Sequence, residues 1–389
     1  MSRIDNLIRK HCPAGVEFKT LGEVIRPKFG ERITKLKDSG IVFPVYGGGG
    51  ESFRTDSCNR TDDWVISRFA MSERCVRYVH GDFWLLDSGF SFDVLLAGVE
   101  KDYVGQILLN LQPIIYETST TSAQKNIDIE GFKKLPIPVP PLEVQREIVR
   151  VLDTFQELEA ELEAELEARK KQYEFYRDSL LNFTDSRERE RVRWLTLGDI
   201  GELVRGTGIQ KSDFIEDGVG CIHYGQIHTH YGTWATETKT FVSAELARRS
   251  RHAKTGDLVI ATTSEDDAAV GKATAWLGVD EVAVSTDAFI LRHTMDPKFV
   301  SYFFQTDDFR KQKQKHITGT KVRRIGKEGL SKIIIPVPPL EIQQKISSVL
   351  DKFDALVNDI SVGLPAELIA RRQQYEFYRD RLLSFEAVA

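Results

Sequence analysis

The chain has 389 residues, of which 41% are hydrophobic and 29% are charged, and this composition is typical of a globular protein with two or three domains. No stretch approaches 18 consecutive apolar residues and the N-terminal segment lacks an apolar centre, so we expect neither a membrane span nor a secretion signal. The four cysteines form no CxxC pair. This argues against a disulfide framework or a structural zinc and favours a cytoplasmic location.

The net charge of −5 is distributed unevenly along the chain. Residues 141–183 carry 6 basic and 11 acidic side chains, whereas residues 298–332 carry 10 basic and 3 acidic ones. Because affinity for phosphate depends on the local field, an acidic chain that contains such a basic segment remains compatible with nucleic-acid binding.

The sequence contains a long internal repeat. IPVPPLE occurs at residues 137–143 and again at 335–341, an offset of 198, and QYEFYRD occurs at 172–178 and again at 374–380, an offset of 202. The globular segments that precede the two IPVPPLE copies share little with each other. Each half therefore consists of a head of its own followed by a common tail segment.

Residues 1–140 are expected to form the first head, of mixed α and β structure, because short apolar runs such as residues 64–67 are typical of strands. The glycines at 47–50 remove side chains from a loop and let backbone approach a partner closely. No Lys-Ser/Thr pair follows, so this is no nucleotide-binding P-loop; a flexible turn and a loop on DNA backbone both remain open. The candidate DNA-binding residues of this head are Tyr46, Gly47, Gly48, Arg68, Ser122, Gln124 and Lys125.

Residues 141–183 are expected to form a first long spacer helix. It follows Pro140 and Pro141, which suit the first turn of a helix. Positions seven apart carry Ile148, Phe155, Leu162, Arg169, Tyr176 and Phe183. Companion positions carry Leu152, Leu166, Tyr173 and Leu180, with Glu159 as the one misfit. This heptad pattern predicts a helix packed along another helix, since a long rod is not stable until its apolar face is buried.

Residues 339–389 repeat the pattern in a second long helix, in which Gly363 and Pro365 predict a break or kink. Only a short charged linker, residues 184–191, joins the first helix to the second head, so the second helix can run back antiparallel. The predicted fold is α+β: two mixed α/β heads held apart by two long helices that form an antiparallel coiled coil, with a pseudo-twofold internal repeat. In the alternative, each helix covers only its own head.

The heptapeptide QYEFYRD contributes aromatic residues to both helices. The tyrosines expected in the seam between the helices are Tyr173, Tyr176, Tyr375 and Tyr378. Phe175 and Phe377 fall at the edge of this seam and are free to contact a partner subunit.

Residues 192–338 are expected to form the second head. Residues 222–231 contain three histidines, but no carboxylate or cysteine stands near them to complete a metal site. This segment could contact bases or be an ordinary polar loop. The basic segment that ends at residues 319–324 could contact phosphates or be a solvated surface. By the offset of 198, the latter segment corresponds to residues 121–126 of the first head. The candidate DNA-binding residues here are Tyr224, Gln226, His228, Thr320, Lys321, Arg323 and Arg324.

Catalytic signatures are missing from the sequence. We find no NPPY-like motif of amino-methyl transfer, no GxGxxG, no Walker A, no HExxH and no GxSxG. The chain is therefore expected to be non-catalytic and to carry no metal.

The doubled segments IPVPPLEVQREIVRVLD at 137–153 and IPVPPLEIQQKISSVLD at 335–351, each followed by a QYEFYRD helix, resemble the specificity subunit of type I restriction–modification enzymes. The opening CPAGVEFKTLGEV at 12–24 and FPVYGG at 43–48 extend the resemblance. It implies that each head is a target-recognition domain for one half of a bipartite, asymmetric sequence in double-stranded DNA, and that the helix pair sets the spacer.

The same resemblance implies the partners and their cofactors. Two methyltransferase subunits carrying S-adenosylmethionine would dock on the helices and heads, and restriction subunits using ATP and Mg would join them. No cofactor is expected on this chain. The alternative from a different class is a non-catalytic coiled-coil adaptor whose heads bind proteins.

Overall fold

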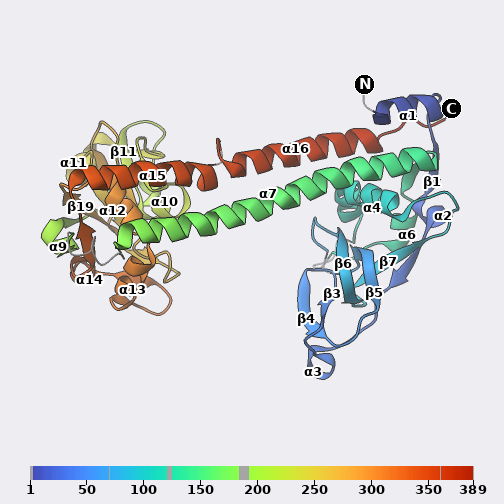
Figure 1. The fold of residues 1–389 in the computed structure, drawn as a ribbon, viewed down its shortest axis with the longest axis horizontal. Coiled ribbons are helices and arrows are strands. Elements are labelled where there is room, and N and C mark those ends of the chain that lie inside the picture. The colour runs from blue at the N-terminus through green and yellow to red at the C-terminus, as the bar shows by residue number, and fades with distance from the viewer. Residues whose placement is uncertain (1–2, 70, 121–124, 184–191, 360, 389) are drawn as a thin grey trace. The chain divides into compact units, whose positions relative to one another are not determined.

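The computed structural model describes residues 3–69, 71–120, 125–183, 192–359 and 361–388 (Figure 1). The chain divides into two compact units. One is formed by Met1–Leu162 with Leu368–Ala389, and the other by Glu163–Glu367. The end of the chain thus belongs to the same unit as its beginning, and each unit contains one head with parts of the long helices.

The first unit is built around a six-stranded mixed sheet. Its strands, in spatial order, are β2 (Ile25–Phe29), β7 (Gly89–Val94), β5 (Arg60–Ser67), β6 (Val76–Leu85), β3 (Phe43–Tyr46) and β4 (Glu51–Thr55). Neighbouring strands are antiparallel except β3 and β6, which are parallel. Trp64 and Ile66 of β5 belong to the main core, whereas Val65 joins a small cluster on the other face. Both faces of this strand are therefore covered.

Short helices and a two-stranded ladder complete the first head. The ladder pairs β1 (Glu17–Thr20) with β8 (Pro136–Val139). The helices are α1 (Arg3–His11), α2 (Leu21–Val24), α3 (Lys35–Asp38), α4 (Lys101–Asn110), α5 (Gln112–Glu117) and α6 (Ile129–Lys133). The backbone N–H of Val16 donates to the Glu386 carbonyl at 2.8 Å, so the end of the chain is hydrogen-bonded to the segment that precedes β1.

The described residues of the second unit form four small sheets. A five-stranded sheet has the order β10 (Gly201–Arg205), β19 (Ala288–His293), β15 (Leu258–Ala261), β17 (Ala273–Trp276) and β12 (Trp234–Ala235). A four-stranded sheet has the order β13 (Thr240–Val242), β11 (Val219–Ile222), β18 (Val282–Val284) and β14 (Arg251–Ala253). A three-stranded sheet has the order β16 (Thr263–Ser264), β21 (Arg323–Ile325) and β20 (Ile317–Thr318). The last sheet pairs β22 (Ile334–Val337) with β9 (Arg193–Thr196), just as β8 pairs with β1.

Short helices cover these sheets. They are α9 (Leu197–Ile200), the 3₁₀ turn Lys211–Asp213, α10 (Tyr224–Thr229), α11 (Ala244–Arg249), α12 (Pro297–Phe303), α13 (Asp307–Gln314) and α14 (Lys327–Ser331). The expected mixed α/β character of both heads is therefore confirmed.

The long helices are α7 (Leu142–Asn182), α15 (Leu340–Asn358) and α16 (Leu364–Leu383). In the first unit, Phe155 stacks on Tyr378 at 5.4 Å between ring centroids, and Glu159 pairs with Arg372 at 2.6 Å. From the first contact to the second, the residue number rises in α7 and falls in α16, so the two helices are antiparallel. In the second unit Tyr176 stacks on Phe353 of α15 at 5.8 Å. The predicted antiparallel helix pair is confirmed within each unit.

The seam follows the heptad pattern at most positions, whereas Arg169 and Tyr176 are exposed. Predicted seam residues that are buried include Ile148, Leu152, Leu166, Tyr173 and Phe183. At the end of α7 it is Leu181, not Leu180, that is fully buried. Glu159, the misfit of the pattern, is satisfied by its ion pair with Arg372, whose long side chain carries the charge to the seam.

The break in the second helix lies where Gly363 and Pro365 predict it. The helix α15 ends at Asn358 and α16 begins at Leu364. A Cβ on Gly363 would lie 2.3 Å from the Ala355 carbonyl oxygen, so the chain can turn this closely around the end of α15 only with a glycine. Pro365 falls in the first turn of α16, where its missing N–H costs nothing.

In the part of the chain that the structure describes, no helix combines the length and the apolar character that crossing a membrane requires.

Gly105 of α4 provides a test of packing in the first head. A Cβ at this position would lie 2.0 Å from the ring of Trp64, which is buried beneath the helix. Gly105→Ala is therefore expected to lower the free energy of unfolding by about 1–3 kcal/mol through overpacking, as measured by urea denaturation. Gly49→Ala is the matched control, because a Cβ there meets nothing within 4 Å. Equal stability of the two variants would contradict this packing.

Candidate nucleic-acid interface

The glycine-rich loop of the first head has two parts with different surroundings. The Gly47 carbonyl accepts a hydrogen bond from the Arg77 guanidinium at 2.9 Å, and the Gly48 carbonyl accepts one from the Ser67 hydroxyl at 2.6 Å. A Cβ on Gly47 would lie 2.4 Å from the Ser88 Oγ, and one on Gly48 would lie 2.7 Å from a backbone oxygen. These two glycines are therefore explained by close packing within the head. Gly49 and Gly50 are exposed.

Tyr46, at the end of β3, contributes mainly to packing. Its ring stands edge-on to Phe83 at 5.7 Å and lies against the small cluster on the far face of the sheet.

Arg68 follows β5 and lies between two aromatic rings. Its guanidinium is 4.8 Å from the centroid of Phe29 and 4.6 Å from that of Phe69. Both rings are partly exposed, at 43% and 39% of their surface. Aromatic faces and a cation that reach solvent together suit stacking on bases. Sequence reasoning missed the two phenylalanines, although Phe69 next to Arg68 was a visible signal.

Backbone hydrogen bonds bring the candidates of the first head together. The N–H of Arg68 donates to Ser88, which adjoins Gly47, and its carbonyl accepts from Ile127 at 3.0 Å. The carbonyl of Lys125 accepts from Met71 at 2.9 Å. The Lys125 ammonium lies 3.9 Å from the ring of Tyr116 and donates to its carbonyl. Ser122 and Gln124 lie outside the described residues.

In the second head, Gln226 is used within the protein. Its Oε1 accepts from the backbone N–H of His223 at 3.1 Å and its Nε2 donates to the Thr240 hydroxyl at 3.0 Å. This buried amide caps α10 and joins it to β13. Tyr224, half-buried, has its ring 4.6 Å from that of His223, and its N–H donates to Ser285 at 2.9 Å.

His228 lies at the end of α10 and connects this helix to the three-stranded sheet. Its Nε2 is 3.0 Å from the carbonyl oxygen of Thr263 in β16. Burial is the main cause that lowers the pKa of His228, so the ring is neutral at physiological pH. Among the described residues no group of three His, Cys, Asp or Glu side chains is arranged to hold a metal ion.

The basic segment at residues 319–324 forms the turn between β20 and β21 and the start of β21. Gly319 has φ +91°, a conformation that favours glycine in such a turn. Thr320, Lys321 and Arg324 are exposed, whereas the Arg323 guanidinium pairs with Asp267 at 2.8 Å and donates to the Gly319 carbonyl. Arg324 is paired with Thr263, to which His228 also bonds. The structure thus brings the two candidate segments of this head together.

Lys313 of α13 is a basic residue that cannot contact DNA from its present position. It is 3% exposed, and its ammonium donates to the carbonyls of Ala268 and Val270 at 2.7 and 2.5 Å. Burial, assisted by Arg310, lowers the pKa of Lys313 to about 8. These bonds hold the loop that carries Asp267, the partner of Arg323. Lys313 therefore supports the hairpin from within, a role that counting charges in the sequence could not reveal.

In the first QYEFYRD copy, the tyrosines and the phenylalanine differ in exposure. Tyr173 is 4% exposed and burial raises its pKa, whereas Tyr176 is 41% exposed and stacks on Phe353. Phe175 is 69% exposed, and its ring stands edge-on to that of Tyr176 at 5.7 Å.

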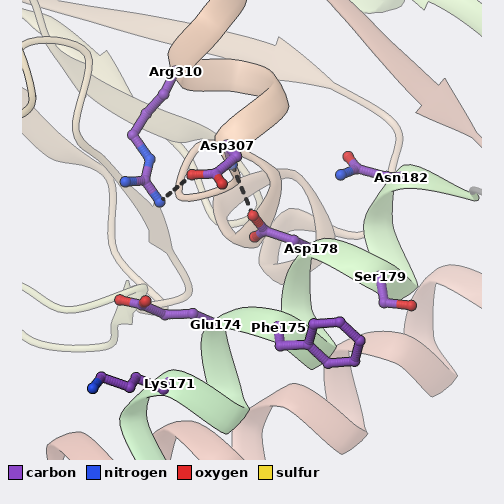
Figure 2. A pocket seen from close by; sticks show the side chains of 8 residues that line it. All are labelled: Lys171, Glu174, Phe175, Asp178, Ser179, Asn182, Asp307 and Arg310. Atoms are coloured by element: carbon purple, nitrogen blue, oxygen red, sulfur yellow. Dashed lines mark hydrogen bonds and ion pairs between the residues drawn. The ribbon is translucent and has the colours of Figure 1, made fainter. Parts of the chain in front are cut away.

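Asp178 of this copy contacts the second head. Figure 2 shows its carboxylate directed at the start of α13, beside a polar pocket of about 470 Å³ that Phe175 also lines. The Asp178 Oδ2 accepts the backbone N–H of Asp307 at 3.0 Å, and Arg177 pairs with the other oxygen at 2.8 Å. A carboxylate at the N-terminus of a helix is stabilised by the unpaired N–H groups there. Sequence reasoning assigned no role to this aspartate.

The second copy repeats the aromatic pattern without this contact. Tyr375 is 9% exposed, and its hydroxyl is 3.0 Å from Gln156 Nε2 and 3.3 Å from Gln106 Oε1. Tyr378 stacks on Phe155, and Phe377 is 61% exposed. Asp380 pairs with the adjacent Arg379 at 2.9 Å, as Asp178 does with Arg177.

Comparisons with known proteins agree with this architecture. A sequence profile of the type I restriction modification DNA specificity domain matches residues 13–168 and 191–370. The chain is 31% identical over 392 residues to a protein of Haemophilus influenzae whose name describes a type I restriction enzyme specificity subunit, covering 95% of this chain and 96% of that one. It is 37% identical over 273 residues to a type I restriction enzyme specificity subunit of Escherichia coli, covering 65% of this chain and 63% of that one.

Solved structures show the same fold. The crystal structure of a type I restriction–modification S subunit from M. genitalium matches with a TM-score of 0.59 at 16% identity, over 95% of this chain and 96% of that one. A structure concerned with the assembly of a type I restriction–modification system matches with a TM-score of 0.63 at 18% identity, over 95% and 98%.

Two different heads, each followed by a copy of the same helical segment, define the class of specificity subunits with paired recognition domains. The chain belongs to the type I restriction–modification specificity subunit family. The resemblance noted in its sequence is confirmed.

The buried lysine predicts a pH dependence of stability. The pKa of Lys313 is lowered to about 8 in the folded chain, whereas an unfolded lysine titrates at about 10.4. Between these values the unfolded state binds more protons, so the contribution of Lys313 to the free energy of unfolding rises with pH, and the penalty for its burial is fully present below about pH 8.

Lys313→Met should remove this rise, which urea unfolding at pH 7.5 and 9.5 would detect as a smaller gain than in the wild type. The exposed Lys315→Met is the control. Identical pH dependence in wild type and Lys313→Met would contradict the assignment.

Proposed function

We propose that this chain is the DNA-reading subunit of a type I restriction–modification complex, with each head recognising one half of a bipartite, asymmetric target in double-stranded DNA. The observation that carries this proposal is that the two halves share the same ladder and long-helix contacts but have different heads. The ladder β1–β8 has its counterpart in β9–β22. Near the start of each long helix a glutamine side chain, Gln145 or Gln343, accepts a backbone N–H from its own head. The sheets of the two heads nevertheless differ in size and order.

The domains follow from this division. We assign the first recognition domain to residues 1–140 and the second to residues 192–338. The spacer helices are residues 141–183 and 339–389. The linker 184–191, which lies outside the described residues, joins the first of them to the second head.

Each head offers a different surface to DNA. In the first, Arg68 with its two aromatic neighbours and the exposed Gly49–Gly50 tip suit stacking and close backbone approach. In the second, the exposed Lys321 and Arg324 suit phosphate contact at the hairpin, next to the α10 segment with Tyr224 and His228. Gly47, Gly48, Tyr46 and Gln226 then act by shaping these surfaces, because their own groups are engaged within the heads.

The partners follow from the family. We propose that two methyltransferase subunits, which carry S-adenosylmethionine, dock on the helices and heads, and that Phe175 and Phe377 take part because both are exposed on the helix pair. Restriction subunits using ATP and Mg would join the complex in the cytoplasm. This chain would supply specificity and perform no chemistry itself.

The target sequence tests the proposal directly. When the chain is expressed with its methyltransferase partner, the modified adenines should lie in two different half-sites separated by a fixed gap, because unlike heads on a two-fold frame read unlike sequences. Sequencing of modified bases would reveal the motif. A palindromic or gapless motif would overturn the proposal.

The hairpin of the second head provides a second test. Replacing Lys321 and Arg324 together by alanine should weaken binding to all DNA sequences and reduce the slope of log K against log salt by about 0.9 per lost phosphate contact. Fluorescence anisotropy over a salt series measures both quantities. Lys345→Ala on α15 is the control, since that exposed lysine lies outside the hairpin. If the double variant binds as the wild type does, the hairpin is only a solvated surface.

A further inference from the structure

A pocket of about 350 Å³ opens on the surface of the first unit, lined by α4, α7 and strands β5 and β6. Aromatic and acidic side chains both line it. Its chemistry-bearing residues are Trp64, Tyr78, His80, Asp102, Asp153 and Glu157. Tyr78 stands edge-on to Trp64 at 5.3 Å and to His80 at 4.8 Å, which makes a continuous aromatic wall.

The carboxylates of this pocket face neutral donors. The Asp102 Oδ1 accepts from the indole N–H of Trp64 at 2.9 Å, and the Asp153 Oδ1 accepts from the Gln106 amide at 3.4 Å. Burial, and then the charge of Asp102, raise the pKa of Asp153. The nearby Lys101 ammonium is bound to Asp63 at 2.6 Å. Within the described residues no basic side chain forms an ion pair with Asp102, Asp153 or Glu157.

The second unit contains the same local frame, and its residues can be matched by their contacts. The N–H of Glu100 donates to Gln145 Oε1 at 2.9 Å, as the N–H of Asp296 donates to Gln343 Oε1 at 2.8 Å. Two residues beyond Glu100 and Asp296 stand Asp102 in the first unit and Lys298 in the second.

The acidic position on the long helix has its match as well. Asp153 corresponds to Asp351, eight residues beyond Gln145 and Gln343 respectively. The contact from Gln106 to Asp153 has its counterpart in the Tyr302 hydroxyl, which donates to Asp351 at 2.8 Å.

In the second unit this carboxylate receives a cation from within the chain. The Lys298 ammonium lies 2.7 Å from the Asp351 carboxylate and 4.2 Å from the centroid of the Trp234 ring. An ammonium between a carboxylate and an aromatic face is a favourable arrangement for both partners. In the first unit a carboxylate, Asp102, stands where this lysine would be. The first unit thus keeps the matching contacts but has no lysine at this position. An open pocket lined by aromatic and acidic side chains lies there.

We propose that the pocket of the first unit binds a cationic side chain, arginine or lysine, of a protein partner, which supplies the charge that Lys298 supplies in the second unit. The aromatic wall and the carboxylates complement a guanidinium or ammonium group. The carboxylates repel a phosphate, which is also negatively charged, so a phosphate does not bind in this pocket. The cation site itself does not depend on the DNA-reading function. We take this partner to be the methyltransferase subunit, and only that assignment rests on the proposed function.

The first experiment uses the full chain and a small probe. Nα-acetyl-arginine methylamide and its lysine analogue should bind the wild-type chain, and the uncharged citrulline analogue should bind at least about tenfold more weakly, as measured by saturation-transfer NMR titration. Asp102→Lys should abolish binding of the charged probes, since the new lysine can pair with Asp153 as Lys298 pairs with Asp351. Asp153→Asn should weaken it without introducing a charge.

Glu117→Lys is the matched charge reversal, on an exposed residue of α5 away from the pocket, and should leave probe binding unchanged. Thermal unfolding shows whether each variant is folded, and Asp153→Asn keeps the test open if Asp102→Lys is not. The proposal is wrong if the charged and neutral probes bind alike, or if both pocket variants retain the wild-type affinity.

The second experiment concerns the occupant. Asp102→Lys should weaken assembly with the methyltransferase subunit about tenfold or more, as measured by isothermal titration calorimetry, while Glu117→Lys assembles as the wild type does. Loss of probe binding with unchanged assembly would overturn the methyltransferase subunit as the occupant. The DNA-reading proposal is judged separately, by the modified-base motif, which does not depend on this pocket.

Discussion

Burial of the apolar face of α7 is the constraint on which both units depend. A helix of this length gains its stability from the surfaces it covers, since propensity alone does not hold it in water. Its first turns are part of the core of the first head, where Val144, Ile148 and Leu152 are fully buried. The α16 segment of the same unit contributes Tyr375, Leu382 and Leu383 to that core. The pairing of the long helices and the folding of the first head therefore bury the same apolar surface.

The antiparallel pairing also explains why one heptapeptide can serve both halves. In each copy a tyrosine is buried in the seam, a second tyrosine stacks on a phenylalanine of the facing helix, and a phenylalanine remains exposed. The aromatic pairs fix the register through their shape, whereas charged neighbours adapt to each head. Asp178 and Asp380 both pair with the arginine beside them, and Asp178 also binds the start of α13. Identical sequence thus performs the common task, and local surroundings decide the rest.

The polar residues of the heads divide into those that shape a surface and those that reach it. Gln226, His223 and Lys313 are buried or nearly so, and their hydrogen bonds hold α10 and the Asp267 loop in place. A buried charge such as that of Lys313 is costly, and two carbonyl acceptors offset part of that cost. Lys321 in the turn of the hairpin and Arg324 in β21 are left exposed. Rigid internal support for a few exposed groups is what sequence-specific recognition requires.

The sequence by itself determined the repeat, the helix seam, the break at Gly363 and the family, because these depend on periodicity, on proline and glycine chemistry, and on identical segments. It also indicated which segments carry the candidate site, since basic, amide and glycine-rich runs are visible in one dimension. Only the tertiary structure decided that Gln226 and Lys313 are engaged within the head, that Phe29 and Phe69 flank Arg68, and that Asp102 stands where Lys298 stands in the other unit. Burial and pairing depend on contacts between residues far apart in the chain, and no local pattern encodes which of several similar polar side chains will face solvent.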